Sequence, residues 1–173
     1  MDLFEILSFS KSLMVVDVSP HLVDFENLKF CYAPVGNSND INPQQMLSLT
    51  TLLNSFAIKD FSLRGSILTD DVMDILYDFL GINSSLISID LSYCGLSDEH
   101  VSGLISALQS NPCSKLSIID LQNNSIGFVG AIAFTSFLEG NSTIIEIVLR
   151  NNSIDIEHYE HITRMTHDRI KLS

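Results

Sequence analysis

Residues 86–96 read LISIDLSYCGL, and this stretch decides the fold. Apolar residues stand at its first, fourth, sixth and eleventh positions, and Cys94, a small side chain with polar capacity, stands at the ninth. The same template begins again at Ile58, Leu116 and Ile144, so the starts at 58, 86, 116 and 144 are 28, 30 and 28 residues apart. A repeat of this length is typical of stacked units that bury their apolar faces against one another, which predicts a solenoid.

Two template positions form a ladder of equivalent residues along the array. The sixth position is leucine in all four units, and the ninth position is asparagine in the last two. An asparagine amide can satisfy backbone groups that a bending chain leaves unpaired. The expected structural ladder consists of Leu63, Leu91, Leu121, Asn124, Leu149 and Asn152.

Each unit divides into a strand half and a helix half. Residues 117–121 alternate apolar and polar side chains, as expected of a half-buried strand. Residues 127–138 then carry Val129, Ile132 and Phe137 at roughly helical spacing. The pattern therefore predicts alternating strands and helices throughout the array.

The LxxLxLxxNxL pattern, with a long helix and a period near 28, resembles leucine-rich repeats of the ribonuclease-inhibitor-like subclass over about residues 56–165. The resemblance implies an α/β leucine-rich-repeat solenoid, or horseshoe, with an inner parallel β-sheet and outer helices. Because this fold hosts many unrelated roles, the resemblance indicates the architecture much more strongly than the function.

The two ends fit the template less well than the middle. Phe25, Leu28 and Phe30 match it once more, with a step of 33 residues from 25 to 58. No polar capping unit precedes them, so self-association through that end stays open, as does a place in a longer repeat array. The expected divisions are an irregular segment or degenerate repeat over 1–24, the leucine-rich-repeat array over 25–154, and a C-terminal capping helix over 155–173.

The acidic charge of the chain limits its partners. The 173 residues carry a formal net charge of -12, which disfavours nucleic acid and an anionic membrane as partners. Residues 1–12 lack the positive start of a secretory signal, and no apolar run is long enough to span a bilayer. We therefore expect a cytoplasmic protein whose partner is another protein.

Motifs for catalysis, metals and cofactors are absent from the sequence. The cysteines Cys31, Cys94 and Cys113 show no CxxC spacing, and no HExxH, GxSxG or phosphate-loop motif occurs. His158 and His161 are three residues apart on an expected helix, but no further ligand at a suitable spacing completes a metal set. We therefore expect no enzymatic activity, no cofactor and no metal.

Parallel stacking places equivalent template positions in columns on the concave side of the sheet. The fifth-position column is expected to contain Lys29, Ser62, Asp90, Asp120 and Val148. Tyr93 is the strongest candidate hot spot, because exposed aromatic side chains carry much of the energy of an interface. The candidate binding residues on the concave face are Arg64, Asp90, Tyr93, Asp120, Gln122 and Arg150.

These features predict a non-catalytic protein–protein interaction module that binds its partner on the concave sheet face. Two alternatives stay open, both suggested by proteins with similar repeats. One is a regulator of a small GTPase, similar to a GTPase-activating protein, which would act through Arg64, Arg150 or Asn123. The other is a structural subunit of a cytoskeletal or axonemal assembly.

Overall fold

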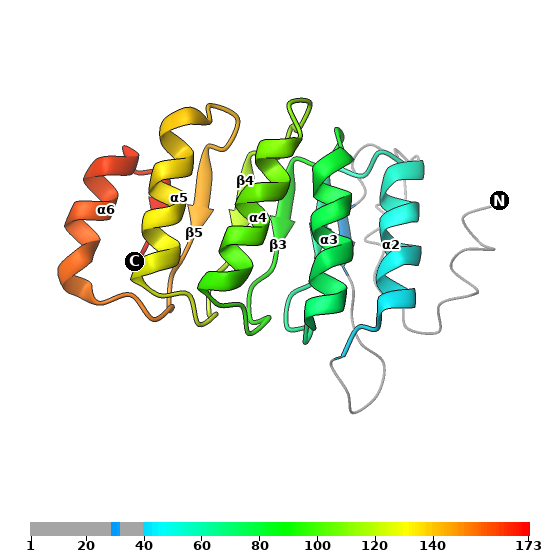
Figure 1. The fold of residues 1–173 in the computed structure, drawn as a ribbon, viewed down its shortest axis with the longest axis horizontal. Coiled ribbons are helices and arrows are strands. Elements are labelled where there is room, and N and C mark those ends of the chain that lie inside the picture. Colours follow the sequence, from blue (N-terminus) through cyan, green and yellow to red (C-terminus); the bar gives the residue numbers. More distant parts are fainter. Residues whose placement is uncertain (1–28, 32–39) are drawn as a thin grey trace, which may run out of the picture.

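The computed structural model describes residues 29–31 and 40–173, which alternate between strands and helices (Figure 1). The expected irregular segment over residues 1–24, through which self-association was left open, lies outside the described residues. The described elements are β1 (Lys29–Cys31), α2 (Pro43–Ser55), β2 (Asp60–Ser62), α3 (Asp70–Ile82), β3 (Ser88–Asp90), α4 (Asp98–Ser110), β4 (Ile118–Asp120), α5 (Phe128–Gly140), β5 (Glu146–Val148), the 3₁₀ helix η2 (Ile156–His158), α6 (Tyr159–Thr166) and β6 (Ile170–Lys171).

The described strands form one parallel sheet in the order β1-β2-β3-β4-β5-β6. Each strand pairs with the next one along the chain, so that Ile89 of β3 lies opposite Ile119 of β4, which lies opposite Ile147 of β5. Figure 1 shows helices α2 to α6 side by side along one face of this sheet. The predicted α/β solenoid, with a parallel sheet and a layer of helices, is confirmed.

The core lies between the sheet and the helices. The sixth-position leucines Leu63, Leu91, Leu121 and Leu149 are each no more than 1% exposed. They join the fourth-position side chains, such as Ile119, in one apolar cluster that runs through all described units. Because each unit buries its apolar residues against the units beside it, the array is one continuous body.

The helices follow from the apolar stripes in the sequence. In α3, the buried residues include Val72, Leu76 and Phe79, at the spacing of one helix face. Helix α2 begins at a capping box, in which Asn42 Oδ1 accepts from the backbone N–H of Gln45 and Gln45 Oε1 accepts from that of Asn42. Within the described part of the chain, every helix is too short or too polar to cross a bilayer.

The first strand is paired in a different register from the one predicted. Phe30 lies opposite Phe61, whereas the template placed Leu28 at that position. The same shift of two residues puts Cys31, and not Lys29, opposite Ser62 in the fifth-position column. A shift of two residues leaves the alternation of a strand unchanged, so the apolar pattern alone could not distinguish the two registers.

The C-terminal segment is shorter in helix than predicted and ends in a strand. Helix α6 stops at Thr166, because His167 and Asp168 take left-handed backbone angles, with φ of 49° and 62°. The chain then returns to the sheet, where Ile170 pairs with Ile147 and is 1% exposed. An expected helical stripe that included Ile170 therefore forms a short edge strand, which covers the last apolar layer.

Candidate partner-binding face

The sheet face away from the helices carries the candidate binding residues. In β3, β4 and β5 the middle residue is buried, while the residues on either side of it are half-buried and face away from the core. The strand register stacks Ser62, Asp90, Asp120 and Val148 in one column. We name the side chains at the third, fifth, seventh and eighth template positions of these strands the open sheet face.

Asp90 and Asp120 form an acidic pair at the centre of this face. Asp90 accepts three hydrogen bonds, from Ser62 Oγ at 3.1 Å, Ser92 N at 3.0 Å and Ser92 Oγ at 2.6 Å. Asp120 accepts from the backbone N–H of Gln122 at 3.0 Å and from Gln122 Nε2 at 3.2 Å. These bonds hold both carboxylates in fixed positions on neighbouring strands.

The surroundings of Asp120 change its pKa. Burial raises the pKa of Asp120 above its usual value, and the nearby charge of Asp90 adds to the rise. The hydrogen bond from Gln122 and the charges of Arg64 and Arg150 act in the opposite direction. A cation placed between the carboxylates would relieve the repulsion, so the pair is suited to a lysine or arginine of a partner.

Tyr93 and Arg64 form a second cluster beside the acidic pair. The Arg64 guanidinium carbon lies 4.5 Å from the centroid of the Tyr93 ring, a cation–π contact. Arg64 Nη1 also donates to Ser92 Oγ at 2.9 Å, which in turn donates to Asp90. Tyr93 remains 50% exposed, so a large part of its ring is open to a partner.

The backbone at Tyr93 is in the left-handed region, with φ of 60°. The equivalent eighth-position residues do the same: φ is 74° at Gly65, 56° at Asn123 and 54° at Asn151. Glycine and asparagine tolerate this conformation well, whereas a bulky side chain does not. Tyr93 is therefore the strained member of a row of identical turns.

Gln122 and Arg150 occupy the seventh-position column with Arg64, but they do not join its cluster. Gln122 bonds to Asp120, and Arg150 Nε donates to the backbone carbonyl of Ser173 at 2.7 Å. The open sheet face thus has an acidic centre, an aromatic–cationic cluster on one side and Arg150 on the other.

Asn124 and Asn152 lie between units rather than on the open sheet face. Asn124 Oδ1 accepts from the backbone N–H groups of Cys94 and Leu96, and its Nδ2 donates to the carbonyls of Leu91 and Leu121. Asn152 repeats this one unit further on, with Nδ2 donating to the carbonyls of Leu121 and Leu149. Both amides therefore join two units through backbone groups.

A second set of side chains also bridges neighbouring units and was not predicted from the sequence. Asn111 Nδ2 donates to the carbonyls of Leu80 and Asn83 in the preceding unit, at 2.8 and 2.7 Å. At the C-terminal end the Arg169 guanidinium donates to the carbonyls of Leu138 and Asn141, which occupy the same repeat positions as Leu80 and Asn83. The signal was present in the sequence, because Asn83, Asn111 and Asn141 recur at the helix ends with the period of the repeat.

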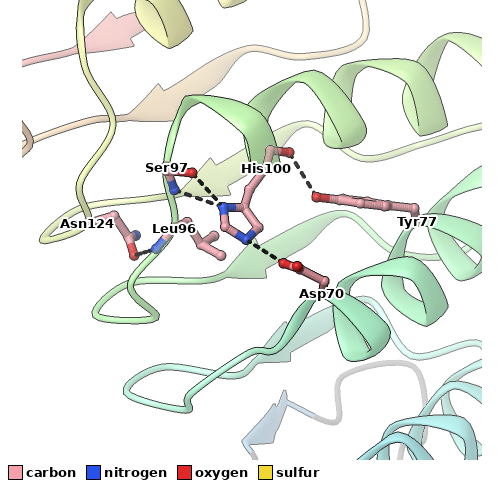
Figure 2. A network of polar contacts seen from close by, with 6 residues as sticks. All are labelled: Asp70, Tyr77, Leu96, Ser97, His100 and Asn124. Atoms are coloured by element: carbon pink, nitrogen blue, oxygen red, sulfur yellow. Dashed lines mark hydrogen bonds and ion pairs between the residues drawn. The ribbon is translucent and has the colours of Figure 1, made fainter.

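A Ser–His–Asp grouping that the sequence did not predict lies at the start of α4 (Figure 2). His100 Nδ1 lies 2.9 Å from Ser97 Oγ and accepts from the backbone N–H of Ser97, and its Nε2 lies 3.8 Å from Asp70 Oδ1. The bond from the Ser97 backbone identifies His100 as a member of a capping box. The carboxylate of Asp70 is almost fully exposed and too distant for a hydrogen bond, so a structural role accounts for the grouping.

Tyr77 joins the same region from α3. Its hydroxyl donates to the carbonyl of His100 at 3.1 Å, which ties α3 to α4 (Figure 2). Burial raises the pKa of Tyr77 to about 12, with Asp74 and Asp70 adding to the rise. Tyr77 is therefore a neutral hydrogen-bond donor at physiological pH.

Metal-ligand geometry among the described residues differs from the set considered in the sequence. Ligand atoms of Asp155, Glu157 and His158 lie within 4.8 Å of one another, whereas His161 is not part of this group. Both carboxylates are exposed. Exposed acidic groups of this kind are common surface features, and the geometry assigns no metal here.

No protein-family model and no curated protein matches the chain. Solved structures do match it, and one of them is Leiomodin-1 actin-binding site 2. That structure aligns with a TM-score of 0.60 and 14% sequence identity, over 76% of this chain and 77% of the other. At this level of identity the likeness establishes the fold, which is leucine-rich-repeat-like.

Proposed function

We propose that the chain is a non-catalytic protein-binding module of the ribonuclease-inhibitor-like leucine-rich-repeat subclass, and that it binds its partner on the open sheet face. The observation that carries this proposal is Tyr93, a half-exposed aromatic ring held in a left-handed turn at the edge of a fixed acidic pair.

The strain at Tyr93 has no evident structural purpose. Gly65 fills the equivalent position without a side chain, so the turn itself does not require an aromatic ring. A bulky residue in left-handed backbone costs roughly 1–2 kcal/mol relative to one that tolerates it. Strained residues cluster at functional sites, and exposed tyrosines are enriched among the residues that dominate interfaces.

The charges on the open sheet face define the kind of partner surface that fits. Asp90 and Asp120 are held by neighbouring groups, so they are preorganised to receive a cation without a large loss of side-chain entropy. The partner surface would place a lysine or arginine between these carboxylates and an apolar or aromatic group on Tyr93. Such complementarity contributes to specificity and to the rate of association.

A cytoskeletal role is the second candidate, and actin is its first test partner. The structural neighbour is named as an actin-binding site, and the two chains share a fold over most of their length. The alternative of a GTPase regulator has less support, because Arg64 stacks on Tyr93 and Arg150 bonds to a backbone carbonyl. An arginine that acts on a nucleotide must be free to reach it.

The experiment is a co-sedimentation assay with actin filaments, accompanied by affinity capture from cell extract to find other partners. Tyr93→Asn is the informative variant, because asparagine tolerates the left-handed turn while removing the ring. We expect it to weaken binding about fivefold or more, as loss of a central aromatic often does. Asp120→Lys should slow association and change its salt dependence.

Asp78→Lys is the matched control, because it makes the same change of charge at an exposed position on α3. We expect it to leave affinity within about twofold of the original, as for surface positions outside an interface. Loss of binding in Asp78→Lys, together with full binding in Tyr93→Asn and Asp120→Lys, would move the partner to the helical face.

A further inference from the structure

Four turns lead from the strands into the helices and form one edge of the solenoid, the lower edge in Figure 1. They comprise residues 66–71, 95–99, 125–129 and 153–158, which together make the helix-start rim. This edge is separate from the open sheet face, and none of the candidate binding residues predicted from the sequence belongs to it.

Contacts between neighbouring units join these turns into one surface. His100 Nε2 lies 3.8 Å from Asp70 Oδ1, which places the start of α4 against that of α3. The backbone N–H of Gly127 donates to Asp98 Oδ1 at 2.7 Å, which joins the start of α5 to that of α4. Gly130 leaves room for Asp98, because an added Cβ would meet its carboxylate. The rim is therefore ordered rather than a set of independent loops.

The C-terminal half of the rim exposes large apolar side chains. Val129 is 70% exposed, Ile156 is 82% exposed and Phe128 is 39% exposed. The rings of Phe128 and His158 lie 4.1 Å apart between centroids, which brings η2 to the first turn of α5. Val129 follows Phe128 in α5 and Ile156 shares η2 with His158, so the ring contact brings exposed apolar side chains of two adjacent units close together, and we call these three apolar residues the apolar cluster. Contiguous exposed apolar patches mark interaction surfaces.

Acidic residues flank this apolar cluster. The four turns contain no lysine or arginine. The exposed acidic residues of the rim are Asp70, Asp71, Glu99, Asp155 and Glu157. Acids at the first turn of a helix compensate its dipole, which accounts for those on α3 and α4. Dipole compensation does not explain the start of α5, because its first turn has no acidic residue. Phe128 and Val129 stand there instead, and both are exposed.

We propose that the helix-start rim docks a basic amphipathic segment of a partner protein, whose apolar side chains cover Phe128, Val129 and Ile156. Lysine or arginine residues on either side of that apolar stripe face the exposed acids of the neighbouring turns. The segment and the rim are complementary in both hydrophobicity and charge, because the charged residues of the rim are all acidic and lie around an apolar centre.

The same charge pattern disfavours the other macromolecules that bind amphipathic or extended surfaces. Nucleic acids carry a phosphate on every residue, and the cytoplasmic leaflet of a membrane is negatively charged. Both would be repelled by the rim acids. A basic protein segment is attracted by them, and its apolar stripe removes Val129 and Ile156 from water.

The test uses the full chain and a designed helical peptide of leucine and lysine, labelled with a fluorophore, with binding followed by anisotropy. A second peptide with glutamate in place of lysine and vesicles of phosphatidylserine and phosphatidylcholine are the comparison ligands. We expect the lysine peptide to bind with an affinity that falls as salt rises, and the other two to bind weakly or not at all. Stronger binding to the vesicles than to the lysine peptide would overturn the proposal.

The variants separate the rim from the general acidity of the chain. Val129→Ser combined with Ile156→Ser should weaken lysine-peptide binding by about tenfold, and Glu157→Lys should weaken it severalfold. The matched controls are Ile82→Ser, 74% exposed at the end of α3, and Glu139→Lys, exposed at the end of α5, both on the opposite edge.

Equal losses in Glu157→Lys and Glu139→Lys would show that the peptide follows net charge alone, and equal losses in the serine variants of the rim and of Ile82 would show that it follows exposed apolar side chains anywhere; either result would refute the docking site. The substituted side chains are exposed, so thermal unfolding should change little and a loss of binding reports the surface itself. Tyr93→Asn, which removes the proposed hot spot of the open sheet face, should leave peptide binding within about twofold. The proposal for the rim and the proposal for the open sheet face can therefore be refuted independently of one another.

Discussion

At the residue scale, neighbouring positions of one turn have opposite roles. The eighth template position is left-handed and faces outward, while the asparagines at the ninth position, Asn124 and Asn152, turn inward and bond to the backbone of adjacent units. Asn123 and Asn124 are the same residue type, yet only the second joins Leu91 and Leu121. The outward-facing and the bridging side chain are therefore adjacent in the sequence, so the proposed binding face and the stability of the array can be changed by separate mutations.

Asn124→Ala should destabilise the fold by about 1–3 kcal/mol, because it leaves backbone N–H and carbonyl groups of two units without partners. Urea denaturation measures this loss. The matched control is Asn123→Gly, since glycine tolerates the left-handed φ of 56° at that position. Similar losses in the two variants would contradict the assignment of Asn124 as the bridging residue.

Asp120→Asn should stabilise the protein at neutral pH, by at most about 1 kcal/mol because the carboxylate is partly solvated. The raised pKa of Asp120 means that the folded chain binds its proton more tightly than the unfolded chain does. The contribution of Asp120 to stability is therefore favourable at low pH and is lost as pH rises through the raised pKa.

Unfolding of both proteins in urea at neutral pH and near pH 3 tests this, since the wild-type carboxyl group is largely protonated at the lower value. The advantage of Asp120→Asn should shrink toward zero at the acidic pH. An advantage that is independent of pH would mean that charge is not its origin. Asp78→Asn, an exposed change on α3, serves as the control and should show no comparable effect.

At the scale of elements, packing of neighbouring helices depends on close approaches as well as apolar stripes. The ring of Tyr77 on α3 lies directly over Gly103 on α4, where an added Cβ would overlap the ring. The same tyrosine bonds to the carbonyl of His100. A glycine inside a helix is ordinarily a weakness, but here it permits an aromatic side chain to join two units.

Gly103→Ala should therefore destabilise the protein by about 1–3 kcal/mol through overpacking, even though alanine is the better helix former. Thermal unfolding followed by circular dichroism measures the change. Gly140→Ala is the matched control, because no atom lies within 4 Å of its added Cβ. A higher melting temperature for Gly103→Ala would contradict this prediction, because it would mean that Tyr77 moves aside without a loss of stability.

At the scale of the whole molecule, the array is held together by residues that serve two units at once. Leu121 is fully buried, and its carbonyl accepts from both Asn124 and Asn152. Since such contacts exist only between adjacent units, stability depends on an unbroken series of interfaces. A defect in the middle of the series should weaken the units on both sides.

Leu121→Ala should lower the free energy of unfolding by roughly 2–5 kcal/mol, as for other fully buried leucines. Hydrogen exchange should show reduced protection in both α4 and α5, the helices on either side of the substitution. Gln122→Ala, a change of a half-buried side chain on the open sheet face, is the control and should cost much less. Loss of protection confined to α5 would show that the units unfold independently.

Much of the architecture was determined by the sequence alone. The period of 28 to 30 residues between the starts at 58, 86, 116 and 144 fixed the number and order of these units. The alternation of apolar residues fixed which side chains enter the core, and the column of Asp90 and Asp120 followed from the template. These properties are local, because the period of two in a strand and the stripe of a helix are set within one unit.

The tertiary structure decided what lies between units. The stack of Arg64 on Tyr93 and the joining of four turns into the helix-start rim involve residues in different units. No pattern within one unit specifies them. The register of the first strand was also decided between units, and it differs by two residues from the predicted one. A shift of two residues leaves the alternation within the strand unchanged, so only pairing with β2 selects one register.

The C-terminal end shows this division most clearly. The sequence favoured a helix through Ile170, because its polar and apolar residues fit one helical face. In the folded chain Ile170 pairs with β5, and Arg169 binds the carbonyls of Leu138 and Asn141. The exposed edge of β5 and the unpaired carbonyls at the end of α5 required partners, and only the folded array creates that requirement.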